Sequence, residues 1–175
     1  AQFCDFVHIV EFTAEPFSFP EWFKYTFPEV IWSDRCVRDD TDIERRVNNT
    51  LLKGLVNDIE VFRCRGLIDE TPHYQQYLAQ INAIRHKYPE LLLGAGTFVY
   101  MDGFTCSNDE IIARGYANGN RLAIVATTLA EEGASGKIDV PGYRFVESSS
   151  IGDVFVNAGR LRLGQHGITV LIYEK

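Results

Sequence analysis

The sequence predicts a small α/β segment followed by an all-β antiparallel sandwich. Helical patterns at 41–54 and 71–89 alternate with short apolar runs, an order typical of α/β architecture. After about Leu91 helical periodicity stops, and short apolar runs separated by glycine-rich turns follow, the spacing of a small sandwich. We therefore expect an α/β segment over 1–93 and a sandwich domain over 94–175, divided between Pro89 and Thr97.

Composition limits the classes of partner. The 175 residues are 46% hydrophobic, which suffices for a real core. The net charge is -7 and no basic stripe is present, so we expect no nucleic-acid partner. No apolar run could span a bilayer and no signal peptide is visible, so we expect no membrane partner. The chain opens on Ala1 and turns strand-like a few residues later, which indicates an excised or processed fragment.

The first half supplies the α/β elements. We expect strands from Phe6 to about Glu15, at 29–33 and at 58–64. Thr41 and Glu44 form a capping-box pattern, and Gly54 can end that helix in a left-handed conformation. The second helix has Thr71 as its predicted cap, Pro72 at its first position and Pro89 at its end. Its apolar face carries Tyr74, Tyr77, Leu78, Ile81, Ile84 and Tyr88.

The second half is punctuated by turns. Asn118-Gly119 separates two alternating runs, a strong hairpin signal. Further strands are expected near 143–147, 154–156, 160–163 and 168–173. The serines at 148–150 are expected to form a loop.

The cysteines show no metal-binding or disulfide pattern. Their spacing contains no C-x-x-C, so we expect buried free thiols and no metal or other cofactor, although calcium bound by backbone oxygens would leave little trace. They are Cys4, Cys36, Cys64 and Cys106.

The stretch from Glu11 to Trp32 allows two interpretations. It holds eight aromatic residues and four glutamates. Glycosidases need two carboxylates facing one bond, and aromatic rings suit the C–H faces of sugars. Alternatively, the rings fill a core while the glutamates face water, which the residues alone favour. A second cluster, "RCRGLIDE" at 63–70, reads more readily as surface ion pairs.

The element order, with "YTFPE", "RCRGLIDETP" and the closing "GITVLIYEK", resembles the carboxyl end of a glycoside hydrolase. It is similar to the last strand–helix units of an α-galactosidase-like or α-amylase-like (β/α)8 barrel with its C-terminal β-sandwich, in an uncharacterised bacterial glycosidase-like family. The resemblance implies a parent enzyme that cleaves oligo- or polysaccharides, with its principal catalytic acids upstream of Ala1.

Within that resemblance, Glu15, Trp22 and Arg65 are expected to line the rim of the parent's site. Glu15 would be an acid or a hydroxyl acceptor, Trp22 a stacking platform and Arg65 an orienting donor. The catalytic residues themselves are not identified. The fragment alone is expected to be inactive and to need the missing amino-terminal part, and a polysaccharide-degrading parent would be periplasmic or secreted.

Two alternatives remain open. The region from Thr97 could be a carbohydrate-binding module, but its aromatic residues include no tryptophan, which favours a sandwich that buttresses a barrel. The whole chain could also be a structural or protein-interaction module without catalysis.

Overall fold

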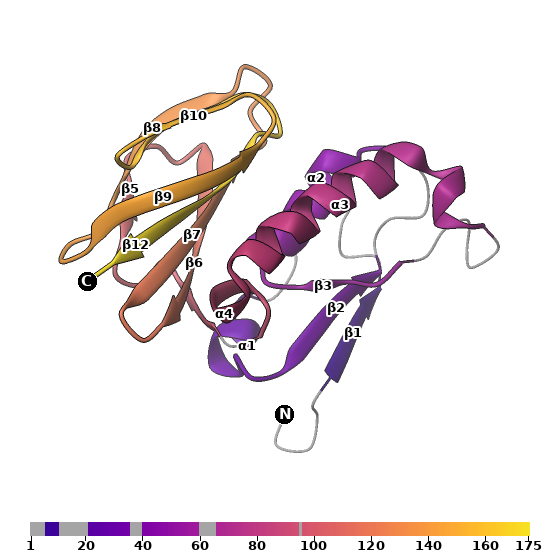
Figure 1. Cartoon of the computed structure of the whole chain (residues 1–175), viewed down its shortest axis with the longest axis horizontal. Coiled ribbons are helices and arrows are strands. Elements are labelled where there is room, and N and C mark those ends of the chain that lie inside the picture. Colours follow the sequence, from indigo (N-terminus) through magenta and orange to yellow (C-terminus); the bar gives the residue numbers. More distant parts are fainter. Residues whose placement is uncertain (1–5, 11–20, 36–39, 60–65, 95) are drawn as a thin grey trace. The chain divides into compact units, whose positions relative to one another are not determined.

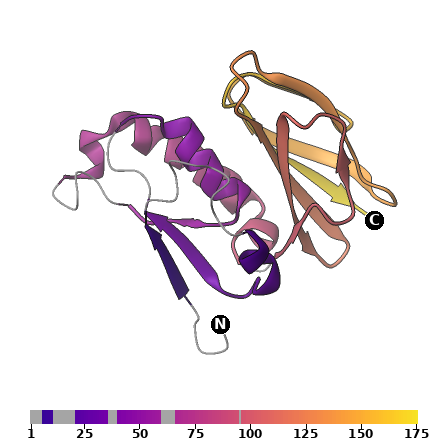
Figure 2. The same cartoon turned by 180° about the vertical axis from the view of Figure 1, so that it is seen from behind.

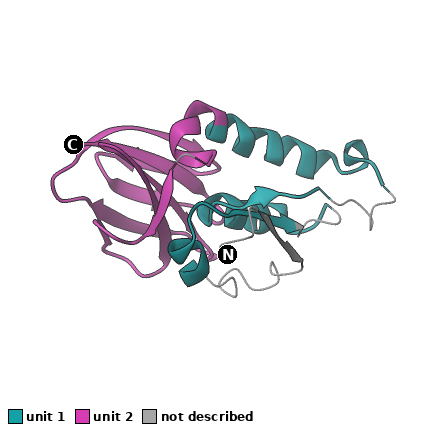
Figure 3. Ribbon diagram, turned by 90° about the horizontal axis from the view of Figure 1, so that it is seen from below, with its two compact units in different colours: residues 1–85 teal, residues 86–175 magenta. Residues whose placement is uncertain are grey.

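A computed structural model gives the fold of the chain and describes residues 6–10, 21–35, 40–59, 66–94 and 96–175, the side chains of 6–10 and 35 excepted (Figure 1). The chain forms two compact units, Ala1–Arg85 and His86–Lys175 (Figure 3). A small α/β part is followed by antiparallel sheets, so the coarse order expected from the sequence is confirmed.

The first unit is built around a parallel three-stranded sheet in the order β1-β2-β3. Each strand pairs with the next one in the chain, through registers such as Phe6↔Ile31 and Ser33↔Val56. The elements are β1 (Phe6–Val10), α1 (Glu21–Thr26), β2 (Ile31–Arg35), α2 (Ile43–Leu52), β3 (Val56–Asn57), the 3-10 helix η2 (Ile68–Glu70) and α3 (Pro72–Lys87).

Helices cover one face of this sheet. Trp32 of β2 and Leu55 beside β3 pack in a buried cluster with Val30, which Phe23 and Phe27 also contact. Figures 1 and 2 show α2 and α3 on the same side of β1–β3.

The opposite face of the sheet is partly exposed. Because side chains alternate along a strand, Ile31 and Val56 point away from the helices. They are 49% and 48% exposed.

Helix α3 begins at Pro72, as the sequence predicts, but the predicted caps of both helices differ from the structure. Helix α2 begins after Asp42, which adopts a left-handed conformation with φ 52°, so Thr41 is not the cap. The hydroxyl of Thr71 donates to the carbonyl of Ile68. The cap of α3 is instead Asp40, whose carboxylate accepts from the backbone N–H groups of His73 and Tyr74 at 3.1 and 2.7 Å. A partner 33 residues away in the chain has no local sequence signal.

Other first-unit predictions are confirmed or fall outside the described part. Gly54 adopts a φ of 65° after α2, and the predicted apolar face of α3 is buried throughout. The strand expected at 58–64 lies mostly outside the described residues, and β3 ends just before it.

The second unit holds two antiparallel sheets, ordered β4-β6-β7-β12-β9 and β10-β11-β8-β5. Strands β6 and β7 form the predicted hairpin, with Gly119 at φ 58° in its turn. The elements are α4 (Pro89–Leu92), β4 (Thr97–Tyr100), β5 (Thr105–Cys106), β6 (Ile111–Asn118), β7 (Arg121–Thr128), β8 (Ala134–Asp139), β9 (Arg144–Ile151), β10 (Val154–Asn157), β11 (Arg160–Leu163) and β12 (Ile168–Glu174).

One hydrophobic core lies between these sheets. Ile124 of β7, Leu171 of β12, Ile138 of β8 and Leu163 of β11 are among its members, and each is at most 2% exposed. Strand alternation directs Val125 and Val170 to the other face of the five-stranded sheet, and both are fully buried there. The central strands β7 and β12 are therefore apolar on both faces.

The serines at 148–150 lie in β9 rather than in a loop. Ser149 bonds the hydroxyl of Tyr88 at 2.9 Å and accepts from Lys87 at 3.0 Å. Lys87 also pairs with Glu147 at 2.7 Å, and this hydrogen bond lowers the pKa of the glutamate and raises that of the lysine. Lys87, the last residue of α3, and Tyr88, which follows it, are thus bound to polar side chains of β9.

Strands β4, β5 and β8 had not been predicted, because they are short or carry polar residues. Cys106 is a free, partly buried thiol, whereas Cys4, Cys36 and Cys64 lie outside the described residues.

We predict that Tyr173→Phe leaves the free energy of unfolding at pH 8 unchanged or raised by up to about 1 kcal/mol. The Tyr173 hydroxyl is buried and finds no hydrogen-bond partner in the described part of the chain, so its removal leaves no group newly unpaired. Burial, aided by Asp139, raises the pKa of Tyr173 to about 12.

The same variant should resist alkali better. Since the folded pKa exceeds the ordinary value of 10.0, the folded state keeps a proton that the unfolded chain loses. This contribution is complete below about pH 10 and is lost towards pH 12. Urea unfolding followed by far-UV circular dichroism at pH 8 and 11 measures both effects. A loss above roughly 2 kcal/mol at pH 8 would mean that the hydroxyl is bonded.

Candidate functional site

The carboxyl ends of the three parallel strands meet at one edge of the first sheet, where α/β enzymes place their sites. Asp34 is the penultimate residue of β2, and Asn57 ends β3. The two are register partners, and Asp34 is only 1% exposed. Both share the helix-covered face with Trp32, so they point away from the face that a closed barrel would enclose.

A buried arginine connects three elements on this face. Arg85 of α3, 6% exposed, donates to the side-chain oxygen of Asn57 at 3.0 Å and to the carbonyl of Leu55 at 2.7 Å. It also reaches the Thr50 hydroxyl at 3.4 Å, and that hydroxyl donates to Asn57 at 3.2 Å. The fixed fork of a guanidinium suits several acceptors at once. The arrangement holds α3 against α2 and β3, which is a structural role.

Polar contacts between α2 and α3 continue towards the Asp40 cap. His73 Nε2 lies 2.9 Å from Glu44 Oε1. The hydroxyl of Tyr77 donates to Asn48 at 2.7 Å, and burial raises its pKa above the ordinary value. These side chains are committed to holding the two helices together, so the described part of the carboxyl edge is a scaffold rather than a reacting centre.

Of the three rim residues expected from the sequence, the structure describes one. Trp22 lies on α1 and is 65% exposed, with its ring centroid 5.0 Å from that of Phe23. Helix α1 leads into the amino end of β2, where Lys24 donates to the carbonyl of Val30 at 3.0 Å. Trp22 therefore lies near the edge opposite the carboxyl ends. Glu15 and Arg65 lie outside the described residues, and all three roles stay predictions.

Lys24 supports this position of α1. Its ammonium also donates to the carbonyl of Pro28 at 3.2 Å, and the residue is 8% exposed. Burial lowers its pKa, while Glu29 opposes the shift. The buried lysine thus fixes the turn between α1 and β2 and leaves the Trp22 ring facing solvent.

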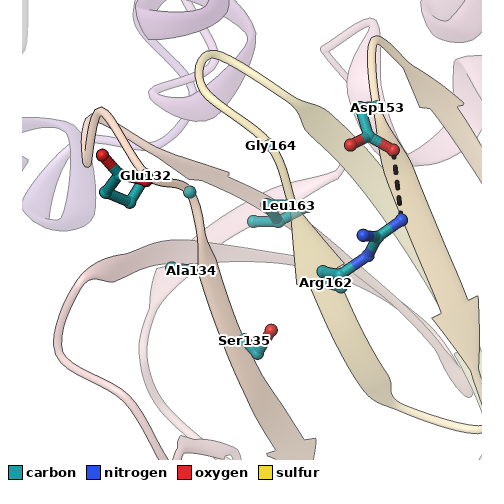
Figure 4. A pocket seen from close by; sticks show the side chains of 8 residues that line it. Glu132, Ala134, Ser135, Asp153, Arg162, Leu163 and Gly164 are labelled. Carbon is teal, nitrogen blue, oxygen red and sulfur yellow. Dashed lines mark hydrogen bonds and ion pairs between the residues drawn. The ribbon is translucent and has the colours of Figure 1, made fainter.

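A small polar cavity of about 160 Å³ lies in the second unit (Figure 4). The segment before β8, the turn between β9 and β10 and the end of β11 meet there. Arg162 and Asp153 point towards one another, with 3.4 Å between Nη2 and Oδ1. The remaining lining residues are Glu132, Gly133, Ala134, Ser135, Leu163 and Gly164.

The described residues contain neither a group of metal-ligating side chains nor a helix able to span a membrane. Over the described ranges, no three His, Cys, Asp or Glu residues are grouped to hold a metal ion. In that same part of the chain no helix is long and apolar enough to cross a membrane.

Comparison with known proteins gives matches at the level of structure only. No protein-family model matches the sequence, and no curated protein matches it. Three solved structures illustrate the similarity. An isomaltulose synthase from Erwinia rhapontici is 15% identical, covering 79% of this chain and 24% of that chain, with a TM-score of 0.43. A GH30 endoxylanase from Clostridium papyrosolvens is 13% identical, covering 98% and 49%, with a TM-score of 0.49. Amy13B from Eubacterium rectale is 17% identical, covering 62% and 21%, with a TM-score of 0.42.

The similar structures are glycoside hydrolases, and this chain spans less than half of the length of each of the three. Their TM-scores, 0.42 to 0.49, do not establish a shared fold.

Two features of these sites, the buried Asp34 and the cavity beside Asp153 and Arg162, were not predicted from the sequence. Asp34 interrupts the apolar run "VIWSDR", a signal that could have marked it as a buried polar residue. The cavity beside Asp153 and Arg162 depends on strand pairing between separate segments, so no local pattern marks it.

We predict that Arg85→Ala lowers the free energy of unfolding of the first unit by about 3 kcal/mol, because its buried acceptors lose a charged donor. Arg85→Lys should restore little of this loss, since an ammonium cannot present the same fork. Gln80→Ala, at an exposed position of the same helix, is the matched control. Tryptophan fluorescence during urea unfolding reports this unit, because both tryptophans lie in it. Equal midpoints for Arg85→Ala and Gln80→Ala would contradict the structural role.

Proposed function

We propose that this chain is the carboxyl-terminal part of a carbohydrate-active glycoside hydrolase. Its first unit would contribute late strand–helix units to a (β/α)8-type catalytic domain, and its sandwich would buttress that domain. The proposed reaction is inferred from the sequence resemblance, which implies a parent enzyme that cleaves glycosidic bonds. The architecture is supported by the exposed face and consecutive order of the parallel sheet.

The sheet order supports a barrel over a doubly wound sheet. In a doubly wound sheet the strand order reverses at a switch point and helices cover both faces. Here the order β1-β2-β3 runs in one direction, and the contacts of Trp32 and Asn57 place helices on one face. A (β/α)8 barrel has this arrangement, with helices outside and strand side chains inside.

The exposed apolar face is the observation that carries the proposal. Parallel sheets are normally covered on both faces. Ile31 and Val56 are each about half exposed on the face away from the helices, while Ser33 between them is buried. Within the described ranges, β1 and β3 each pair with one strand, β2. Further strands of the same domain would pair with these edges and enclose this face.

The proposed buttressing role rests on the five-stranded sheet. An antiparallel sheet often has one solvated face, but Val125 and Val170 are apolar and buried on the face away from the sandwich core. Helix α4 of the same unit packs on β6 and β7 of this sheet, and we propose that it forms part of the supporting surface. The proposed partners are an oligo- or polysaccharide and the amino-terminal part of the same protein. A polysaccharide-degrading parent would act in the periplasm or outside the cell.

We predict that this chain alone does not hydrolyse polysaccharides, whereas a longer protein carrying its upstream residues does. In that protein, Glu15→Ala is expected to lower kcat by about 10²-fold if Glu15 acts as an acid. Arg65→Ala should also lower kcat, because it removes an orienting donor. Trp22→Ala should mainly raise KM, because a stacking platform contributes to substrate binding rather than to the chemical step. Reducing-sugar assays on xylan, starch and cellulose measure these effects, and unchanged turnover in all three variants would refute the rim assignment.

We also predict that the chain alone exposes an apolar sheet face. It should bind the dye ANS or self-associate as its concentration rises, and Ile31→Lys with Val56→Lys should roughly halve the dye signal. Leu67→Lys, at a position 67% exposed outside the sheet, is the control and should change it little. ANS fluorescence and size-exclusion chromatography make the measurement. A monomer that binds no dye at any concentration would contradict the need for covering strands.

A further inference from the structure

We propose that the outer face of the four-stranded sheet binds a neutral sugar ring at Phe155 and the adjoining cavity. We call this surface the Phe155–Arg162 face and define it by Phe155, Arg162, Ser135, Asp153 and Glu132. It lies entirely within the second unit, so it does not depend on the proposed catalytic domain.

Strand pairing brings the central residues of this face together. Phe155 of β10 is the register partner of Arg162 of β11, and Arg162 is the partner of Ser135 of β8. Directly paired side chains on one face lie close enough to act on one ligand. The neighbours Val154, Val156 and Leu163 point into the core, so alternation directs Phe155, Arg162 and Ser135 outward.

The aromatic ring supplies an apolar surface in polar surroundings. Phe155 is 56% exposed; the side chain paired beside it is that of Arg162, which is itself paired with Ser135 on the next strand. A flat ring at such a position can pack against the C–H face of a pyranose or furanose. A ligand without an apolar face would gain nothing from Phe155.

The cavity supplies hydrogen-bonding groups for hydroxyls. Arg162 and Asp153 point towards one another along its wall, with Glu132 across from them (Figure 4). Guanidinium donors and carboxylate acceptors on one wall suit a sugar hydroxyl, which both donates and accepts. The Arg162–Asp153 distance of 3.4 Å is long for a charged hydrogen bond, so both groups retain capacity for a ligand.

Charge and size narrow the class of ligand. Charges of both signs lie on this outer face: Arg162, Arg160 and Lys137 against Asp153, Glu132 and Asp139, which sum to 3 - 3 = 0. A face without net charge favours a neutral ligand over phosphate, sulfate or uronic acid groups. The volume of about 160 Å³ is below the roughly 300–1,000 Å³ of pockets for drug-sized ligands. The cavity therefore fits one ring of an oligosaccharide while the rest stays in solvent.

The backbone beside the cavity is constrained by two glycines. A Cβ on Gly133 would lie 2.3 Å from the carbonyl oxygen of Leu163, and its φ is 76°. A Cβ on Gly164 would lie 3.0 Å from Cβ of Asp153. The strands approach closely here only because side chains are absent, and this approach holds Asp153 beside Arg162.

The test is a titration of the ¹⁵N-labelled full chain with maltohexaose, cellohexaose and xylohexaose, followed by amide chemical shifts. We expect saturable shifts around Ser135, Asp153, Phe155 and Arg162 with at least one of them. Phe155→Ala and Arg162→Ala should each weaken that binding at least tenfold. Val146→Ala, at another exposed apolar position of the same unit, should leave it unchanged. Both test positions are exposed, so the variants should keep the dispersed spectrum of the folded chain.

Three results of the sugar titrations would overturn the proposal. They are the absence of saturable shifts with all three sugars, binding that persists in Phe155→Ala, and shifts confined to other surfaces. Inorganic phosphate and a lysine-rich peptide, titrated in parallel, should not compete for the site. Competition by either would show a surface for charged ligands. Loss of sugar binding here would leave the hydrolase proposal standing, because that proposal is tested by the activity of the longer protein.

Discussion

A parallel sheet requires cover on both faces, and this requirement governs the first unit. Crossover helices supply the cover on one side, where Trp32 meets the aromatic residues of α1 and Arg85 binds Asn57. On the other side the exposed residues are aliphatic, although water would favour polar ones. Under the proposal, further strands of the same domain would cover these aliphatic side chains. The hydrolase proposal depends on this mismatch more than on any catalytic side chain.

The second unit forms its sheets and buries its hydrophobic core without further strands. Antiparallel pairing lets each sheet form from neighbouring hairpins, and the core between the sheets is well filled by aliphatic residues. The residues of β9 that face Lys87 and Tyr88 are polar, and they are satisfied by those two side chains. Arg121 adds an ion pair with Glu90 of α4 and a second with Glu174 at 3.2 Å. Short-range polar contacts therefore bind α4 to this sheet.

Features that depend on local chemistry could be predicted from the sequence. Gly119 permits the tight turn between β6 and β7, and the fourfold spacing along α3 identifies its buried face. The helix caps could not be predicted, because the carboxylate of Asp40 reaches α3 from a distant segment and displaces the local cap at Thr71. The loop predicted at the three serines of β9 was wrong for a similar reason. Their hydroxyls are satisfied by partners such as Thr169, 2.8 Å from Ser150, and those partners are brought close only by folding.

The candidate sites also differ in how far local sequence could reveal them. Residue type and chain position suggested Glu15, Trp22 and Arg65. The two-residue turn Ala158-Gly159 joins β10 to β11 in a hairpin and so sets Phe155 beside Arg162, but the cavity next to them also needs β8, which comes from a separate segment. The pairing of Phe155 with Arg162 exists because β10 and β11 pair in one particular register, and a shift of one residue would turn the ring into the core. Strand β10 is also at the edge of its sheet, where exposed apolar residues favour unwanted strand pairing and proteins usually place charged ones. An aromatic ring at that position works against solubility, and a sugar that covers it would explain why the ring is there.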